Sequence, residues 1–152
     1  MTPLLLQRSS LLVFLQEQVL PPLIQQRASL TECLRILSIG CRAGDEASTL
    51  ALLVQSLLPN ESAEKQITLF ATDNDPAAIS HARDYHYPAH LLHHLPETVH
   101  HLLTADTSEY QLHPSLRQRI LFGPHALLTQ MPFPHLDLIL SHDTLSDFAP
   151  VE

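Results

Sequence analysis

The sequence predicts an α/β fold with a mostly parallel sheet and flanking helices. An apolar run at 34–39 is followed by a glycine turn, Gly40 to Gly44, and then by apolar residues at helical spacing as far as Leu58. A second apolar run, residues 67–72, begins after a polar loop. Because a strand, a helix and a strand in succession form a parallel pair with a right-handed crossover, these three segments predict the fold class.

The segment before the first strand predicts a helix. Apolar residues at 11–19 recur at helical spacing, and we expect this helix to end at Pro21 and Pro22. Its composition is Leu, Gln and Pro, which suggests packing against the sheet or a partner and no chemistry of its own. We therefore predict a helical segment at 1–32 and a second unit at 33–152.

The segments after the second strand continue the alternating pattern. Asp75, followed by a proline, predicts the N-cap of a helix. The stretch 85–113 predicts a helical excursion with a short strand at 110–112. Residues 119–122 and 136–140 are apolar and predict a third and a fourth strand. The fourth strand would present an unfinished edge that the amino-terminal helix or a partner has to cover.

Composition and charge limit the classes of function. The 152 residues are 45% hydrophobic and 16% charged, as expected for one folded domain. Lys and Arg total 8 against 16 Asp and Glu, so nonspecific binding to nucleic acid or anionic lipid is disfavoured. Cys33 and Cys41 form no C-x-x-C pair, and neither a secretory cleavage pattern nor an apolar run of membrane length is present. We expect a cytoplasmic protein without membrane insertion; the sequence leaves its oligomeric state open.

The glycine turn and an aspartate further along suggest a ligand site. The spacing of Gly40 and Gly44 is G-x-x-x-G without a phosphate-loop lysine, which disfavours a pyrophosphate ligand. Asp45 and Glu46 in the first helical turn would repel phosphate but can accept hydrogen bonds from a less anionic cofactor. Asp73 follows the second strand, at the sheet edge where doubly wound sheets bind ligands. The alternative is an ordinary strand-to-helix turn with acidic capping.

Three blocks, in the same order, resemble the CheR-type chemotaxis-receptor glutamate methyltransferases, which use S-adenosylmethionine. GCRAGDEASTLA (40–51) is similar to the family's G-C-(S/A)-T-G-E-E turn and the helix after it. FATDNDPAAISHARDYHYP (70–88) resembles F-A-T/S-D-I-D with A-R-x-G-x-Y-P. PHALLTQMPFPHLDLILSHDTLSDF (124–148) resembles the stretch with H-N-L-L, P-F, D-L-I, C-R-N and I-Y-F. The resemblance implies a Rossmann-like methyltransferase fold, incomplete at its carboxyl-terminal end.

The resemblance also implies roles for individual residues. Gly40 and Gly44 would shape the cofactor turn, and Glu46 would face the methionine end of S-adenosylmethionine. Asp73 would take the ribose hydroxyls, and Leu127 would line the adenine side. The resemblance assigns no catalytic residue.

The chain departs from the family pattern on the cofactor and substrate face. Ala126 stands where the family has an asparagine. The C-R-N block reads Ser141, His142 and Asp143, so a carboxylate replaces a neutral amide at a candidate cofactor-binding position. Asp147 replaces the tyrosine of I-Y-F. These departures weaken the expectation of catalysis more than the expectation of the fold.

Two functional hypotheses follow from the resemblance. The first is methyl transfer to a glutamate carboxylate of a protein substrate in chemotaxis-like signalling, an in-line displacement that depends on positioning more than on a strong base. The second is a noncatalytic relative that serves as a cofactor-binding or protein-interaction module with a signalling partner. The altered C-R-N block favours the second hypothesis.

A third hypothesis, from another class, is a metal site. Helical spacing would align His86, His90 and His94 at i, i+4 and i+8, and three imidazoles on one face can bind zinc. Pro88 interrupts such a helix, which favours an ordinary solvated surface. The histidines of this stretch are His86, His90, His93, His94, His100 and His101.

Several polar residues have structural explanations. Cys41 is expected to be a small buried side chain within the turn, without a nucleophilic role. Asp137 lies inside an apolar strand and is expected to pair with a loop amide or an arginine. His125 and His135 are expected to be loop histidines with ordinary hydrogen bonds.

Overall fold

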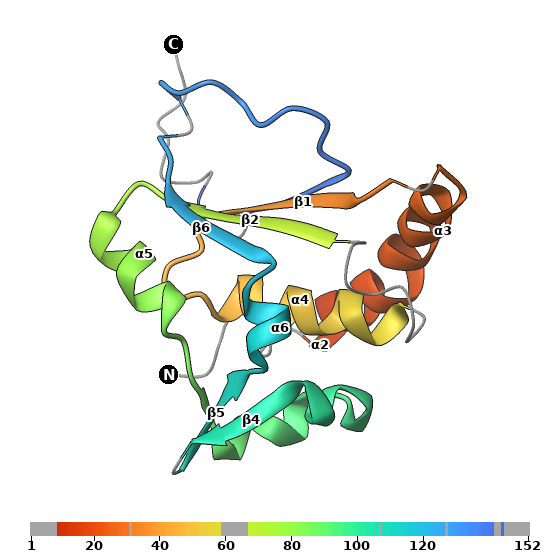
Figure 1. Cartoon of the computed structure of the whole chain (residues 1–152), viewed down its shortest axis with the longest axis vertical. Helices are drawn as coiled ribbons and strands as arrows, with labels where there is room; N and C mark the ends of the chain where they lie inside the picture. Colours follow the sequence, from red (N-terminus) through yellow and green to blue (C-terminus); the bar gives the residue numbers. More distant parts are fainter. Residues whose placement is uncertain are drawn as a thin grey trace.

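A four-stranded sheet with helices against it and a smaller three-stranded sheet form the chain (Figure 1). This computed structural model describes residues 9–30, 32–58, 67–106, 108–126, 128–141 and 144. The larger sheet has the strand order β6-β2-β1-β7, and helix α4 lies against one of its faces (Figure 1). The α/β fold class predicted from the sequence is confirmed, and the architecture is a Rossmann-like one.

The strand–turn–helix–strand unit is present as predicted. Strand β1 (Leu34–Ile39) leads into α4 (Asp45–Leu57), and β2 (Ile67–Asp73) returns parallel to β1. Leu34 lies opposite Ile67, and the two strands stay in register to their carboxyl ends. The residues that follow β1 and β2 are therefore neighbours at one edge of the sheet.

The third and fourth predicted strands are confirmed, and they flank the β1–β2 pair on its two sides. Strand β6 (Ile120–Pro124) is parallel to β2, and β7 (Leu138–Ser141) is parallel to β1. Helix α5 (Pro76–Arg83) begins as expected, because the Asp75 side chain accepts a hydrogen bond from the Ala77 N–H at 2.9 Å. Among the described residues, β7 has a strand neighbour on one side only.

Helix α4 is more deeply buried than its amphipathic pattern predicts. Residues from Glu46 to Val54 are all buried. One side of the helix packs on the sheet, and the other side meets the small sheet, where the hydroxyls of Thr49 and Tyr87 lie 3.0 Å apart in a buried hydrogen bond. This hydrogen bond satisfies two polar groups that burial would otherwise leave without partners.

The amino-terminal segment is helical and joins the core. Helix α2 (Ser9–Phe14), the π-helical turn η1 (Leu15–Val19) and α3 (Leu20–Leu30) follow one another directly. Leucines of these helices share one buried cluster with the sheet. The division between 1–32 and 33–152 stays a prediction. Within the described ranges, no helix has the length and apolar character needed to cross a membrane.

The expectation that Pro21 and Pro22 end the first helix is wrong. The Leu20 N–H bonds to the Leu15 carbonyl, five residues back, as in a π-helix. A proline in a regular α-helix removes an N–H and its ring clashes with the carbonyl four residues earlier. The wider π-helical turn comes immediately before the prolines, and they occupy the first turn of α3, where missing N–H groups are tolerated.

The excursion after α5 forms the small antiparallel sheet, with the order β3-β5-β4. Strand β3 (Tyr87–Pro88) is followed by two 3₁₀ helices, η3 (Ala89–His94) and η4 (Glu97–Leu102). Strands β4 (Leu103–Asp106) and β5 (Glu109–Leu112) then pair antiparallel. The small sheet and its 3₁₀ helices lie on the side of α4 away from the larger sheet (Figure 1).

The predicted strand at 110–112 is confirmed, but the helical excursion expected over 85–113 is wrong at Leu103–Asp106, which form strand β4. Leu103 pairs with Leu112, and Thr104 pairs with Gln111. A short helical pattern carries little intrinsic stability, so pairing with a neighbouring strand decides the conformation.

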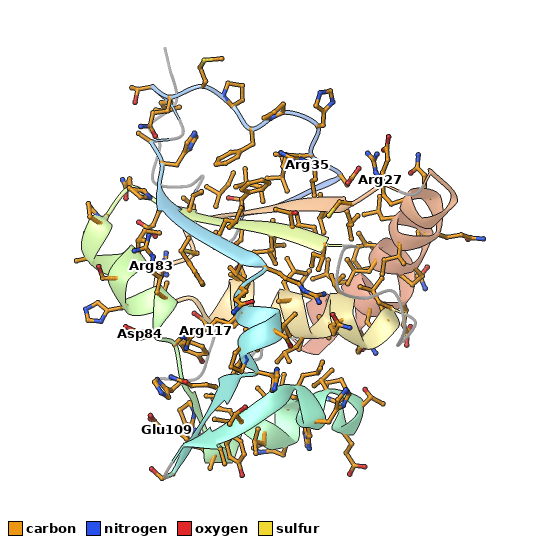
Figure 2. All side chains as sticks on the ribbon, in the orientation of Figure 1. Arg27, Arg35, Arg83, Asp84, Glu109 and Arg117 are labelled. Carbon is orange, nitrogen blue, oxygen red and sulfur yellow. The ribbon has the colours of Figure 1, made fainter. Side chains whose placement is uncertain are left out.

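Asp137 links the amino-terminal helices to the sheet. Its carboxylate accepts hydrogen bonds from Arg27 Nε at 2.7 Å, from a second Arg27 nitrogen and from the Arg35 N–H at 2.8 Å. Figure 2 shows Arg27 and Arg35 close together at the start of β1. The expectation that Asp137 pairs with an arginine is confirmed, and a backbone amide is a second partner.

Gly44 provides the first test of this fold. It is the N-cap of α4 with φ of 87°, and an added Cβ would lie 2.7 Å from the Ala82 carbonyl oxygen. We expect Gly44→Ala to lower the free energy of unfolding by about 2–3 kcal/mol, from left-handed strain and a backbone clash. Urea denaturation measures this difference.

Gly123 offers a matched control, because an added Cβ would meet nothing within 4 Å. Gly123→Ala should stay within about 0.5 kcal/mol of the unmodified chain. Equal stability of the two variants would contradict the described packing of Gly44.

Candidate functional site

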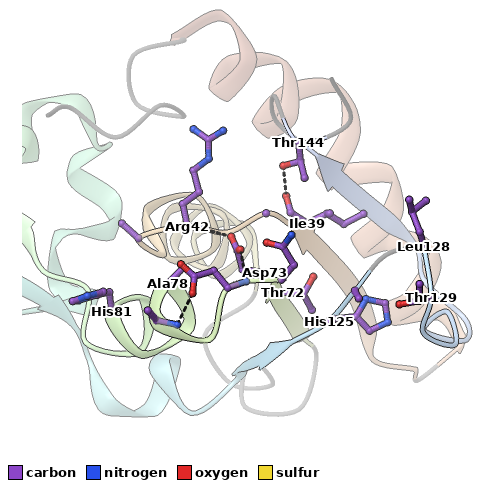
Figure 3. Close-up of a pocket in the computed structure, with 16 residues that line it drawn as sticks. Ile39, Arg42, Thr72, Asp73, Ala78, His81, His125, Leu128, Thr129 and Thr144 are labelled. Carbon is purple, nitrogen blue, oxygen red and sulfur yellow. Dashed lines mark hydrogen bonds between the residues drawn. The ribbon is translucent and has the colours of Figure 1, made fainter. Parts of the chain in front are cut away.

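A cavity of about 840 Å³ lies at the carboxyl ends of β1 and β2 (Figure 3). Its wall is formed by the turn after β1, the end of β2, the first residues of α5 and the loop after β6. This is the edge at which open α/β sheets bind ligands. The volume falls in the range of small-molecule sites, about 300–1,000 Å³.

The turn after β1 is fastened to β2 through its backbone. The N–H groups of Gly40 and Cys41 both donate to the Thr72 carbonyl oxygen, at 2.8 and 2.9 Å. Gly40 has φ of 69°, and an added Cβ would lie 2.1 Å from Thr144 Oγ1. Thr144 Oγ1 in turn donates to the Ile39 carbonyl oxygen at 3.2 Å. Glycine at position 40 thus permits the close approach of Thr144 on one wall of the cavity.

Asp73 ends β2 and lines the cavity, where the sequence predicts a ligand carboxylate. One carboxylate oxygen accepts the Arg42 N–H at 3.0 Å, and the other accepts the Asp75 N–H at 3.0 Å. These two bonds fix the orientation of the carboxylate. Each oxygen carries a second lone pair, so Asp73 can accept further hydrogen bonds from a pair of ligand hydroxyls.

Glu46 and Gly44 lie beneath the turn and are not among the residues that line the cavity. Glu46 is buried, and its carboxylate accepts a hydrogen bond from Ser38 Oγ at 2.9 Å. Gly44 packs against the backbone of Ala82 in α5. Both residues pack behind the turn, on the side away from the cavity. The contact of Glu46 with the methionine end of a cofactor stays a prediction.

The part of the site formed by the loop after β6 and by the residues after β7 is described only in part. Leu127 and Asp143 lie outside the described residues, so their cofactor contacts stay predictions. Ala126 and Leu128 line the cavity with apolar surface. His125 also lines it, donating its backbone N–H to the Asp73 carbonyl at 2.9 Å. The loop after β6 is thereby joined to the same strand end that holds the turn.

Sequence reasoning missed cavity residues that come from distant or unexpected positions. Thr144 lies far along the chain from Gly40, and no sequence pattern links the two. Arg42 lies between the two glycines, and its charge among acidic neighbours was the available signal. Its φ of 45° is uncommon for a residue with a side chain.

Cys41 has the expected structural role. Its side chain is 1% exposed. Burial, and then the negative charge of Asp73, raise the pKa of the Cys41 thiol to about 12. The thiol is therefore protonated at neutral pH and unsuited to nucleophilic chemistry.

The structure does not support the metal hypothesis. The stretch from Ala89 to His94 is a 3₁₀ helix, in which residues three apart share a face, so the i, i+4, i+8 alignment is lost. His86 precedes this helix, and its ring hydrogen-bonds Gln111. His100 Nε2 lies 3.2 Å from the Leu92 carbonyl oxygen. Across the described residues, no group of three or more His, Cys, Asp or Glu is placed to hold a metal ion.

The parallel sheet, the glycine turn and the acidic end of β2 together define a Rossmann-like cofactor-binding domain. The family model for the CheR methyltransferase, SAM binding domain, matches residues 5–152, so the chain belongs to this family. The domain of this family binds S-adenosylmethionine (SAM). The resemblance found in the sequence is confirmed.

Two curated relatives agree with this assignment. An uncharacterized 104.1 kDa protein in the hypE 3′ region of Rhodobacter capsulatus is 34% identical over 137 residues, which cover 90% of this chain and 14% of that protein. A chemotaxis protein methyltransferase of Borreliella burgdorferi is 24% identical over 140 residues, which cover 89% of this chain and 50% of that protein. The chain thus spans half or less of the length of these relatives.

The residues of the cavity fit SAM. Asp73 offers acceptor oxygens for the two ribose hydroxyls. Ile39, Ala126 and Leu128 provide apolar lining suited to an adenine ring. The close packing of Gly40 against Thr144 leaves no room for a side chain at position 40. The described residues of the cavity are therefore chemically suited to the cofactor of the family.

The two cysteines test the burial of the turn. Cys33 is partly exposed, whereas Cys41 is buried with a pKa of about 12. At pH 8 we expect Ellman's reagent to label Cys33 in the folded protein and Cys41 at least about a hundredfold more slowly, because the reagent needs a thiolate. The measurement is absorbance over time, before and after urea.

Cys33→Ser is the matched control and should remove the fast phase. A second fast equivalent of thiol in the folded protein would contradict the burial of Cys41.

Proposed function

We propose that this chain is the SAM-binding part of a methyltransferase that acts on a glutamate side chain of a signalling protein. The family supports methyl transfer, and one relative is a chemotaxis protein methyltransferase. The observation that carries the proposal is Asp73, whose carboxylate faces the cavity and is fixed by the backbone of the glycine turn. The glutamate substrate class is what the resemblance of the three sequence blocks to the CheR-type methyltransferases implies.

The chain's own residues hold and orient the cofactor. When bound, SAM supplies a methyl group that a carboxylate oxygen can take by in-line displacement. Asp73 would accept hydrogen bonds from the ribose, and the Arg42 and Asp75 N–H groups keep that carboxylate in position. A preorganised acceptor loses little orientational freedom on binding, so more of the interaction energy goes into affinity.

A second candidate function is a noncatalytic SAM-binding module. The observation in its favour is Ala126, whose methyl group lines the cavity where the family pattern has an asparagine. An alanine side chain cannot hydrogen-bond the cofactor, so one polar contact is lost. Loss of a single neutral hydrogen bond weakens binding by roughly tenfold, which is compatible with a site that still holds SAM.

Asp73→Asn tests the proposal. An amide can present only one oxygen, so its NH₂ group would face the N–H of either Arg42 or Asp75. We expect SAM affinity to fall by about 10–100-fold, as measured by titration calorimetry. The same preparations are then incubated with labelled SAM and glutamate-containing receptor-type peptides, and base-labile methyl esters are counted.

Asp84→Asn is the control, because Asp84 is an exposed aspartate at the end of α5, outside the cavity. It should leave SAM affinity unchanged. Thermal denaturation of both variants separates loss of binding from loss of folding. Binding with transfer supports the methyltransferase, and binding without transfer supports the noncatalytic module. Absence of SAM binding at millimolar concentration would refute both.

A further inference from the structure

Arg42 is the one permanently cationic side chain among the described residues that line the cavity. We propose that its guanidinium binds the carboxylate of the methionine portion of SAM. This inference rests on the proposed function, because it assigns a residue to the amino-acid end of the same cofactor. It makes Arg42 the residue that distinguishes SAM from adenosine compounds without that carboxylate.

The backbone of the turn fixes where the Arg42 side chain begins. The Arg42 N–H donates to the Asp73 carboxylate, so its Cα is held beside the group expected to bind the ribose. The residue has φ of 45°, in the left-handed region. Figure 3 shows the side chain rising from the turn with its guanidinium directed away from Asp73. The cation thus begins on the turn residue whose backbone N–H holds the carboxylate expected to bind the ribose.

The guanidinium is available to a ligand. The Arg42 side chain is exposed. The two ion pairs found within the described residues are formed by Arg27, with Glu32 and with Asp137, and neither involves Arg42. A guanidinium can donate two parallel hydrogen bonds to one carboxylate, which adds orientation to charge attraction.

The charges around the cavity leave one place for a carboxylate. Asp73 and Asp75 line the cavity, and Asp45 and Glu46 lie in the first turn of α4 directly behind the glycine turn. An anionic group near these four carboxylates is repelled, whereas a sulfonium and an ammonium group are attracted. SAM carries both positive groups and one carboxylate. Arg42 is the described cavity residue that can offset the repulsion of that carboxylate.

The histidines of the cavity do not replace Arg42. His125 is held by its own loop, because its Nε2 lies 3.1 Å from the Met131 carbonyl oxygen. His81 lines the cavity from α5, beyond the acidic end of β2. Neither lies on the glycine turn. Arg42 is therefore the cationic cavity residue whose own backbone is hydrogen-bonded to the Asp73 carboxylate.

Titration calorimetry with two ligands tests the inference. SAM and decarboxylated SAM share the adenine, ribose, sulfonium and amino groups and differ only in the carboxylate. For the unmodified chain we expect SAM to bind about 10–50-fold more tightly than decarboxylated SAM. Arg42→Ala should lose about this factor for SAM and change the affinity for decarboxylated SAM by less than about twofold.

Two further variants complete the design. Arg42→Lys keeps the charge without the fork geometry and should fall between Arg42→Ala and the unmodified chain. Arg117→Ala removes an exposed arginine outside the cavity and should leave both affinities unchanged. Thermal denaturation confirms that each variant is folded.

The outcomes separate this inference from the proposed function. If Arg42→Ala weakens both ligands equally, Arg42 shapes the turn and does not bind the carboxylate, which overturns the inference. If Arg42→Ala weakens neither ligand, the inference is also overturned, while SAM binding by the unmodified chain keeps the proposed function. If the unmodified chain binds neither ligand, both fail.

Discussion

The end of β2 holds the turn that follows β1, and the rest of the site depends on this attachment. The Thr72 carbonyl accepts the N–H groups of Gly40 and Cys41, and the Asp73 carboxylate accepts the N–H of Arg42. Three successive amides of the turn are thus bonded to two successive residues of the neighbouring strand. These bonds are possible because β1 and β2 are parallel and in register, so their carboxyl ends coincide. The cavity wall is therefore a consequence of strand pairing.

Much of the fold follows from local patterns in the sequence, and the two errors have different physical causes. The apolar periods of β1, α4 and β2 and the cap at Asp75 predict these elements because each pattern matches one conformation. The failure at Pro21 arises from local helix geometry, and the failure at Leu103 arises where a neighbouring strand overrides local preference. A π-helical turn accommodates the prolines, and pairing with β5 makes a strand of residues whose pattern suggests a helix. Such effects depend on residues distant in sequence or on small changes in helix geometry.

In the candidate site, too, some residues can be predicted from local sequence patterns and others cannot. The position of Asp73 can be predicted, because the last residue of a parallel strand necessarily reaches the ligand edge of the sheet. The need for glycine at position 44 cannot be predicted in this way, because it comes from the close approach of α5, which the sequence does not reveal. Thr144 reaches the turn only through the fold, and the contact of the Arg42 N–H with Asp73 joins residues 31 apart that no local pattern links. Leu127 and Asp143 lie outside the described residues, and their cofactor contacts remain predictions.

Hydrogen exchange, followed by mass spectrometry with and without SAM, tests the central claim most directly: SAM binds at the joined ends of β1 and β2. Bound cofactor should slow exchange of the Arg42 and Asp75 amides, because it restrains the Asp73 carboxylate that both amides contact. Peptides covering 40–43 and 74–78 should therefore gain protection, while 103–106 and 109–112 of the small sheet should not. Protection confined to the small sheet, or none at saturating SAM, would contradict the account.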